Sequence, residues 1–332
     1  MSHPFTSTLL EEIGRELGLP IELEPRFRQA GVITLSGGRR SYFRLSTIDC
    51  NRSGAAKIAA DKDYASYFMQ RLGFPVPVGK AFFSHEWCVV NKTSNDTRAA
   101  LAYAEELGFP VMVKPNSKAQ GIGVTKVYTQ EELRLALEAV FLIDPIALVQ
   151  RVVPGRDYRL IVYKDSVPIA YERIPLTIIG NGHDTVHELL LTHLIALRAR
   201  GRNILFDAND RRIVQRLQSM YSYTQASIPR GGERVQLLDN ANMSAGGEGN
   251  DITETLHPTY RERAVAIARD MGLTLTGVDV MTTEDITQPL GTHTIIEIND
   301  RPGLEHYSAL GAVQRARVKA LYTRVLMDLE SG

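Results

Sequence analysis

The stretch GFPVMVKPNSKAQGIGVTKVY, residues 108–128, decides how this chain is interpreted. A run of apolar residues ends at Lys114, and the polar segment that follows contains Gly121 and Gly123. A cation at the end of an apolar strand beside a glycine-bearing loop is typical of a phosphate site, because backbone N–H groups and a fixed positive charge both attract anions. A hairpin with a solvated lysine has the same pattern. The stretch leaves both interpretations open, and other segments have to separate them.

Composition excludes several classes of protein. The chain has 332 residues, is 44% hydrophobic, and carries 38 basic against 38 acidic side chains, so nothing indicates a nucleic-acid or membrane-surface partner. Two cysteines, Cys50 and Cys88, argue against a disulfide scaffold and favour the cytoplasm. Residues 1–19 carry acids where a signal peptide needs a basic start, and an Asp-Pro pair interrupts the apolar run 136–150. We therefore expect no membrane span and a cytoplasmic location.

Helical and strand patterns alternate along the chain, which predicts an α/β or α+β architecture. Thr129 with Glu132, and Thr185 with Glu188, have the spacing of capping boxes at helix starts. The expected helices span 55–74, 98–109, 131–142, 186–200, 258–272 and 314–330. The expected strands span 110–115, 147–150, 274–281 and 293–300, with a hairpin over 158–174.

Three oxygen-bearing side chains stand in two of these strands. Glu297 and Asn299 alternate with Ile296 and Ile298, so they should share one face while the isoleucines enter the core. Asp279 lies between valines in the strand before. If the strands are neighbours, the acids and the amide converge as ligands suited to magnesium, which prefers oxygen. The alternative is that each polar residue simply faces solvent.

The lysine-bearing loop matches neither common nucleotide motif. It has no third glycine in dinucleotide spacing and no GxxxxGK[ST] phosphate loop, so Rossmann and P-loop binding are not supported. Gln150 ends an apolar strand, and Asp157 follows after a turn. An amide can bind an adenine edge, and a carboxylate can accept hydrogen bonds from ribose hydroxyls.

In order and spacing, the lysine strand and loop, VQRVVPGRD (149–157), GVDVM (277–281) and EINDRPGL (297–304) resemble the ATP-grasp superfamily. The resemblance covers roughly residues 55–325. Residues 155–163, 174–190 and 240–258 are most similar to the ATP-grasp part of cyanophycin synthetases and to glutathione-synthesising ATP-grasp modules. D-Alanine–D-alanine ligases resemble the chain more distantly.

The resemblance implies an ATP-grasp fold, with a small N-terminal lobe and two lobes clasping ATP. It gives expected units of 1–54 (a short region that is a candidate for substrate contact), 55–95 (a linking lobe), 96–155 (the small ATP-grasp lobe) and 156–332 (the large lobe with the metal site). It also implies roles for individual residues. The implied ATP-binding residues are Lys62, Lys114, Ser117, Gln120, Gly121, Gly123, Gln150, Arg151, Val153 and Asp157; the implied metal ligands are Asp279, Glu297 and Asn299; and the implied catalytic residues are Arg159, Asn242 and Arg301.

The chain departs from the family pattern at three places. Gln150 stands where many relatives have glutamate, and Gly277 stands where D-alanine ligases have an arginine, so Arg301 is a candidate for the missing cation. The N-terminal region, about 50 residues, is shorter than in typical relatives. It contains Arg39, Arg40 and Arg44, which could bind a substrate carboxylate or form a solvated turn.

The resemblance predicts an ATP-dependent carboxylate–amine ligase that forms an amide, or peptide, bond through an acylphosphate. Its substrates would be amino acids or short peptides, its cofactors ATP and Mg²⁺ with Mn²⁺ as a substitute, and its partners neither nucleic acid nor membrane. A homodimer is left open. Two alternatives remain: a carboxylase-type or other acylphosphate-forming ATP-grasp enzyme, and a nucleotide-binding protein without turnover.

Overall fold

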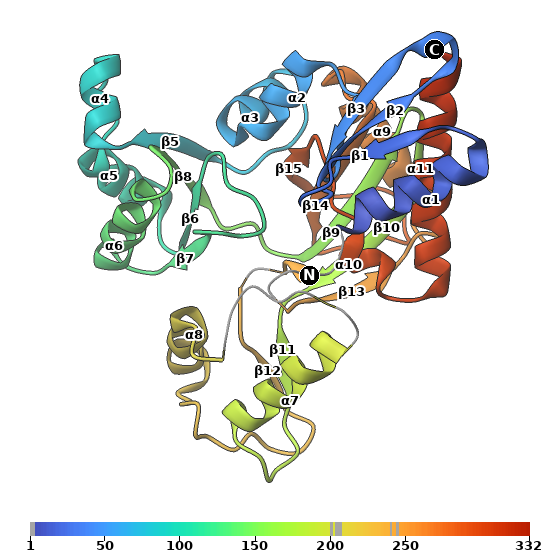
Figure 1. Ribbon diagram of the computed structural model, residues 1–332. Coiled ribbons are helices and arrows are strands. Elements are labelled where there is room, and N and C mark those ends of the chain that lie inside the picture. The colour runs from blue at the N-terminus through green and yellow to red at the C-terminus, as the bar shows by residue number, and fades with distance from the viewer. Residues whose placement is uncertain (1–3, 200–201, 203–207, 240, 244–245) are drawn as a thin grey trace.

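The computed structural model describes residues 4–199, 202, 208–239, 241–243 and 246–332. Figure 1 shows three lobes: one around β5–β8, one around the largest sheet with both chain ends near it, and one formed by β11, β12, α7 and α8. Every strand pairing in the described part of the chain is antiparallel, which excludes a doubly wound parallel sheet there. None of the helices described is long and apolar enough to cross a membrane.

The strands form four sheets, and the strands of each sheet are named in the order in which they lie side by side. The N-terminal sheet contains β1 (Ile21–Leu23), β2 (Ala30–Thr34), β3 (Arg40–Arg44) and β4 (Thr47–Ile48). The small sheet contains β5 (Gly79–Phe83), β8 (Ile146–Arg151), β6 (Val111–Pro115) and β7 (Thr125–Val127). The large sheet contains β13 (Glu248–Asp251), β10 (Ser166–Ile174), β9 (Arg156–Tyr163), β14 (Leu275–Thr282) and β15 (Thr294–Asn299). The last pair is β11 (Thr177–Ile179) with β12 (Arg234–Gln236).

The helices follow the predicted capping signals. Thr129 and Thr185 each accept a hydrogen bond of 3.2 Å from the backbone N–H of the glutamate three residues later, so both predicted caps are confirmed. The helices are α1 (Phe5–Leu17), α2 (Ser53–Ala60), α3 (Lys62–Arg71), α4 (His85–Asn91), α5 (Thr97–Leu107), α6 (Gln130–Phe141), α7 (Val186–Ala199), α8 (Arg211–Tyr221), α9 (Pro258–Asp270), α10 (Glu305–Ser308) and α11 (Ala312–Ser331).

The predicted helix over 55–74 was wrong in one respect, because it is two helices. Asp61 has extended backbone angles, φ −103° and ψ 108°, and its carboxylate accepts the N–H of Tyr64 at 3.0 Å. When an aspartate side chain binds the N–H groups at the start of a helix, the preceding helix cannot continue through that residue. The break makes Lys62 the first residue of α3 and turns it toward the small sheet.

The small sheet takes in a strand from the preceding expected unit. Strand β5 lies in the range 55–95, but it pairs with β8 along Gly79–Phe83 and so joins the sheet of the 96–155 range. Helices α2 and α3 of that same range pack instead against β15 of the large sheet. Strand pairing and helix packing therefore divide the 55–95 range between two lobes.

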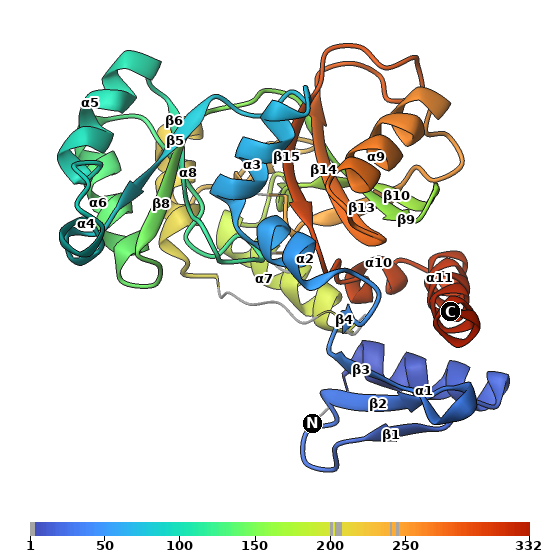
Figure 2. The same cartoon turned by 90° about the horizontal axis from the view of Figure 1, so that it is seen from above.

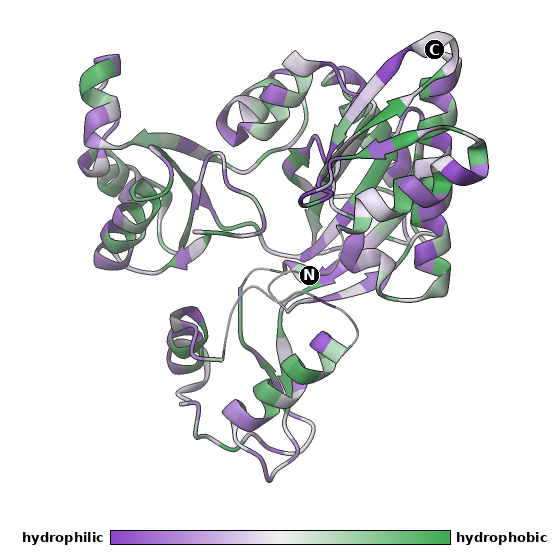
Figure 3. Cartoon of the chain, viewed as in Figure 1, coloured by the Kyte–Doolittle hydropathy of each residue, from purple (hydrophilic) through white to green (hydrophobic). Residues whose placement is uncertain are grey.

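Strand alternation gives the large sheet two different faces. On one face Tyr158 and Leu160 of β9 pack with α3 and α9, and on the other Ile161 and Tyr163 pack with α1 and α11. The second face is apolar only toward one end of the strands. At the other end, the positions that continue the alternation are Asp157 and Arg159. Figure 3 shows hydrophobic residues along the strands of the larger sheets and also along the helices.

Candidate active site

Charged side chains from four neighbouring strands meet at the polar end of the large sheet. Asp157 of β9 lies opposite Arg173 of β10, and Arg159 of β9 lies opposite Asp279 of β14. Asp279 in turn lies opposite Glu297 of β15. Each of the two arginines therefore lies opposite an acid, Asp279 also lies opposite a second acid, Glu297, and we call these five residues the charge ladder. Side chains that lie directly opposite each other on adjacent strands are close enough to interact.

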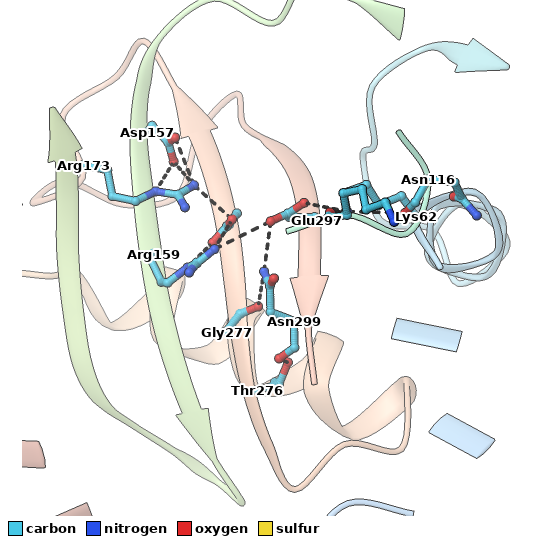
Figure 4. A network of polar contacts seen from close by, with 11 residues as sticks. Lys62, Asn116, Asp157, Arg159, Arg173, Thr276, Gly277, Glu297 and Asn299 are labelled. Atoms are coloured by element: carbon cyan, nitrogen blue, oxygen red, sulfur yellow. Dashed lines mark hydrogen bonds and ion pairs between the residues drawn. The ribbon is translucent and has the colours of Figure 1, made fainter. Parts of the chain in front are cut away.

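The members of the charge ladder are joined by short contacts, drawn in Figure 4. Arg159 donates from Nε and Nη2 to the two carboxylate oxygens of Asp279, both at 2.6 Å. Arg173 donates to Asp279 at 2.9 Å and to Asp157 at 2.7 Å, so one guanidinium joins two acids. Glu297 lies 3.6 Å from Arg159. Paired hydrogen bonds of this kind are strong and fix the orientation of both side chains.

The ladder corrects one premise of the sequence interpretation. In the sequence Asp279 is an isolated acid between valines, and magnesium was the cation expected to balance its charge. It is 1% exposed, and burial alone would raise its pKa, but Arg159 and Arg173 outweigh burial and hold the pKa of this carboxyl below its usual range. The protein thus supplies the cations itself, and the carboxylate stays ionised.

A β-bulge places Glu297 beside Asp279. The register between β14 and β15 shifts after the Asp279–Glu297 pair, because the next residue, Val280, faces Ile295. The extra residue, Ile296, is only half-buried, while Ile295 and Ile298 are buried in the core. The expectation that Ile296 enters the core was therefore wrong, because a bulge breaks the alternation of side chains.

Two of the residues implied by the resemblance share the open face of the small sheet. On β6 and β8, the valines at 113 and 149 face the helices of the small lobe, so Lys114 and Gln150 face the opposite way. Lys114 is 6% exposed, and within the described residues its ammonium has no hydrogen bond or ion pair. Burial lowers the pKa of Lys114 to about 8, although Glu297 acts against this shift.

Gln150 is buried because its neighbour on β5 has no side chain. Gly79 lies opposite Gln150, and a Cβ on Gly79 would lie 2.4 Å from Cγ of Gln150. Glycine at this position leaves the room that the amide occupies. Arg151 follows at the exposed end of β8, where its N–H donates to the carbonyl of Val78 at 2.8 Å, and Val153 lies half-buried in the connection to β9.

Lys62 connects the small sheet to the large one. Its Nζ donates to the backbone carbonyl of Lys118 at 2.6 Å and lies 3.9 Å from Glu297. Asn116 accepts the N–H of Asp63 at 2.9 Å, which holds the start of α3 against the same loop. The structure thus brings Lys62 to both the loop after β6 and the charge ladder, as Figure 4 shows.

The loop after β6 is anchored at its first residue. The N–H and the hydroxyl of Ser117 both donate to Asp144 at 2.7 Å. Gln120, Gly121 and Gly123 all have positive φ, between 59° and 73°, so the loop folds into successive tight turns. Such a run of turns directs backbone N–H groups to one side, as anion-binding loops do.

Two implied catalytic residues lie apart from the charge ladder. Arg301 is more than half exposed, with its Nε 3.8 Å from Asp300. Asn242 accepts the N–H of Gly247 through its backbone carbonyl at 3.2 Å, and no contact joins it to the ladder within the described residues. The cation nearest to Gly277 is Arg159, whose Nε would lie 3.6 Å from a Cβ at that position.

Two residues that hold the site together were not predicted from the sequence. Arg173 joins Asp157 and Asp279, and Asn116 holds α3. A signal for Arg173 was present, because it stands two residues after Tyr171 on a strand whose other side chains on that face are apolar. Asp157, for which the resemblance implies ribose binding, already has its carboxylate bound by Arg173.

Comparison with known proteins supports the fold. The D-ala D-ala ligase C-terminus family matches residues 68–178. A cyanophycin synthetase from Nostoc sp. is 30% identical over 99% of this chain and 36% of its own length. The glutathione biosynthesis bifunctional protein GshAB of Streptococcus thermophilus is 30% identical over 79% of this chain and 35% of its own length. The chain thus spans about a third of the length of these curated relatives.

Solved structures agree with this result. A bifunctional glutathione synthetase from Pasteurella multocida matches 97% of this chain and 44% of its own, with a TM-score of 0.59 and 23% identity. A D-alanine–D-alanine ligase from Bacillus anthracis matches 85% of this chain and 72% of its own, with a TM-score of 0.50 and 15% identity. We conclude that the chain has the ATP-grasp fold, and that its sequence is similar to part of cyanophycin synthetases and of GshAB proteins.

Proposed function

We propose that this protein is an ATP-dependent ligase that joins a carboxylate to an amine. The observation that best supports the proposal is the position of Lys114, a buried ammonium without an ion-pair partner among the described residues. An uncompensated buried cation destabilises a fold, so its presence argues for an anionic ligand. Lys62 and the turns after Ser117 lie at the same place, where the γ-phosphate of ATP would add negative charge.

The proposed reaction has two steps. A substrate carboxylate oxygen attacks the γ-phosphorus of ATP, the bond to the β-phosphate oxygen breaks, and ADP leaves. The amine then attacks the acyl carbon of the acylphosphate, phosphate leaves with the bonding electrons, and the amine loses a proton. Protein groups of fixed charge stabilise the charge that develops on the phosphoryl oxygens. Lys62, Lys114 and Arg159 would supply these charges, and Gln150 would hold the adenine.

The donor atoms are suited to magnesium only in part. No group of three or more His, Cys, Asp or Glu in the described residues is arranged to hold a metal ion. Glu297 and Asn299 lie side by side, with Nδ2 of Asn299 3.2 Å from Glu297, and both have an oxygen without a short hydrogen bond. Magnesium commonly takes one or two protein ligands and completes its shell with phosphates and water.

These two residues would therefore hold the ion together with ATP, and Asp279 would join them only by giving up a guanidinium contact. Bound there, Mg²⁺ would neutralise phosphate charge, and Mn²⁺ would be its substitute.

The test of the proposed function is ADP release in the presence of pairs of amino acids and peptides, with mass spectrometry of the product. We expect release to require both an acid and an amine, and the product to be their amide. Lys62→Met should abolish release, while Lys80→Met, a change on the helix-covered side of the small sheet, should not. Release that depends on bicarbonate, or ATP binding without any release, would contradict the proposal.

A further inference from the structure

A large cavity lies next to the charge ladder but outside it. It has a volume of about 990 Å³ and lies between the N-terminal sheet and α2. Figure 2 shows β4 between α2 and the other strands of this sheet. Its lining includes Asp300 and Arg301, which directly follow Asn299 at the end of β15. One end of the cavity therefore reaches the end of the strand that carries Glu297.

Hydrogen bonds hold the walls of the cavity to the large sheet. The amide of Asn51 donates to the carbonyls of Leu275 and Asp300, both at 2.8 Å, and accepts the N–H of Thr274 at 2.8 Å. The hydroxyl of Ser46 donates to the carbonyl of Arg301 at 3.2 Å. The walls are thus attached to β14 and to the residues after β15, so a ligand in the cavity would lie in a defined position relative to the ladder.

Two cations in the cavity lining have charged groups that no direct contact occupies. The side chains of Arg44 of β3 and Lys57 of α2 form no hydrogen bond or ion pair with other described residues. Of the acids in the lining, Glu24 is occupied by the N–H groups of Arg26 and Phe27, at 2.9 and 2.7 Å. The remaining acids give the cavity charges of both signs, as a zwitterionic ligand would need.

The cavity is larger than a single amino acid needs, and part of its lining is apolar. Val32 and Tyr42, which lie opposite each other on β2 and β3, are among the lining residues. A volume of this size lies at the upper end of the range of roughly 300–1,000 Å³ for small-ligand pockets. A chain of several linked amino acids has the length, the charges at both ends and the apolar body that match it.

We propose that this cavity binds a short peptide with a free carboxylate, and that Arg44 and Lys57 bind that carboxylate. The proposal names peptides, not single amino acids, as the substrate class of the ligase, and in that sense it rests on the proposed function. Binding itself does not depend on ATP. Arg44 belongs to the arginine group whose role the sequence leaves open, whereas Arg39 donates instead to the carbonyl of Leu329 at 2.8 Å.

The experiment is a binding measurement on the full chain without nucleotide. The protein is equilibrated separately with a random tripeptide pool, with the same pool amidated at the C-terminus, and with an equimolar mixture of the twenty amino acids. Retained molecules are recovered by ultrafiltration and counted by mass spectrometry. We expect retention of tripeptides with a free C-terminal carboxylate and at least tenfold less of either other mixture. Arg44→Gln and Lys57→Gln should each lower tripeptide retention about tenfold.

Arg40→Gln is the matched control, since Arg40 lies on the same face of β3 but does not line the cavity. Equal loss in the Arg40 and Arg44 variants, equal retention of amino acids and tripeptides, or no retention at all would overturn the proposal. Thermal melting of each variant checks that it remains folded. ADP release in the ligase assay is scored separately, so failure of peptide binding and failure of the ligase function remain distinguishable.

Discussion

Replacing Lys114 by methionine should make the protein more stable and inactive at the same time. Burial lowers the pKa of this lysine from 10.5 to about 8, a difference of about 2.5 units. Each unit corresponds to about 1.4 kcal/mol, so the folded state loses about 3 kcal/mol by keeping the ammonium charged. Methionine has a similar length and no charge, and it removes this cost.

The pH dependence follows from linkage. A lysine whose folded pKa is below its unfolded value binds fewer protons when folded, so stability rises with pH between the two values. The cost is therefore fully present below pH 8 and is lost between pH 8 and 10.5. Lys114→Met should gain its largest advantage at pH 7, up to about 3 kcal/mol, and should approach the wild type near pH 10.5.

Urea unfolding of both proteins at several pH values measures this difference, and ADP release measures turnover. Lys80→Met is the control, since Lys80 is an exposed lysine of the same sheet. It should leave stability within about 0.5 kcal/mol of the wild type and should retain activity. If Lys114→Met were less stable at pH 7, or if its advantage were independent of pH, the ammonium would not be desolvated. Normal ADP release in this variant would remove Lys114 from the site.

Three further predictions concern the same site. Gly79→Ala should displace the side chain of Gln150 and lower the free energy of unfolding by about 1–3 kcal/mol. In steady-state kinetics it should raise the KM for ATP more than it lowers kcat, and an unchanged KM would contradict this reasoning. Arg173→Met should destabilise the fold by about 3 kcal/mol in urea unfolding. This is the lower end of the ~3–5 kcal/mol range for a broken buried ion pair, because Asp279 keeps the guanidinium of Arg159. A loss below about 1 kcal/mol would mean that the contact contributes little to stability. Glu297→Gln should raise the magnesium concentration needed for half-maximal ADP release with little effect on folding, and superimposable magnesium titrations would exclude Glu297 as a ligand.

The sequence was sufficient to predict helices α5, α6, α7, α9 and α11 and strands β6, β8, β9, β10, β14 and β15, because their signals are local. Capping residues at 129 and 185, and alternating apolar residues at 278 and 280, act over a few positions. The break at Asp61 has an equally local cause, but an aspartate inside an amphipathic pattern also fits the exposed face of a continuous helix. Local signals therefore predict that an element exists better than they predict where it ends.

The charge ladder could not be predicted in the same way, because it depends on register between strands far apart in the sequence. Asp279 and Arg159 are opposite each other only because β9 and β14 pair at that register. A shift of one residue would move every side chain to the other face. The bulge beside Glu297 is likewise invisible in the alternation, which is why Ile296 was assigned to the core.

The four separate hydrophobic cores have a consequence for how the protein unfolds. The small sheet with α5 and α6 has its own core, as does the unit of β11, β12, α7 and α8, and neither shares a residue with the cores on the two faces of the large sheet. Units of this kind can open one at a time. We expect hydrogen exchange to resolve the small sheet as a cooperative unit of its own, and ATP to protect it together with the large sheet.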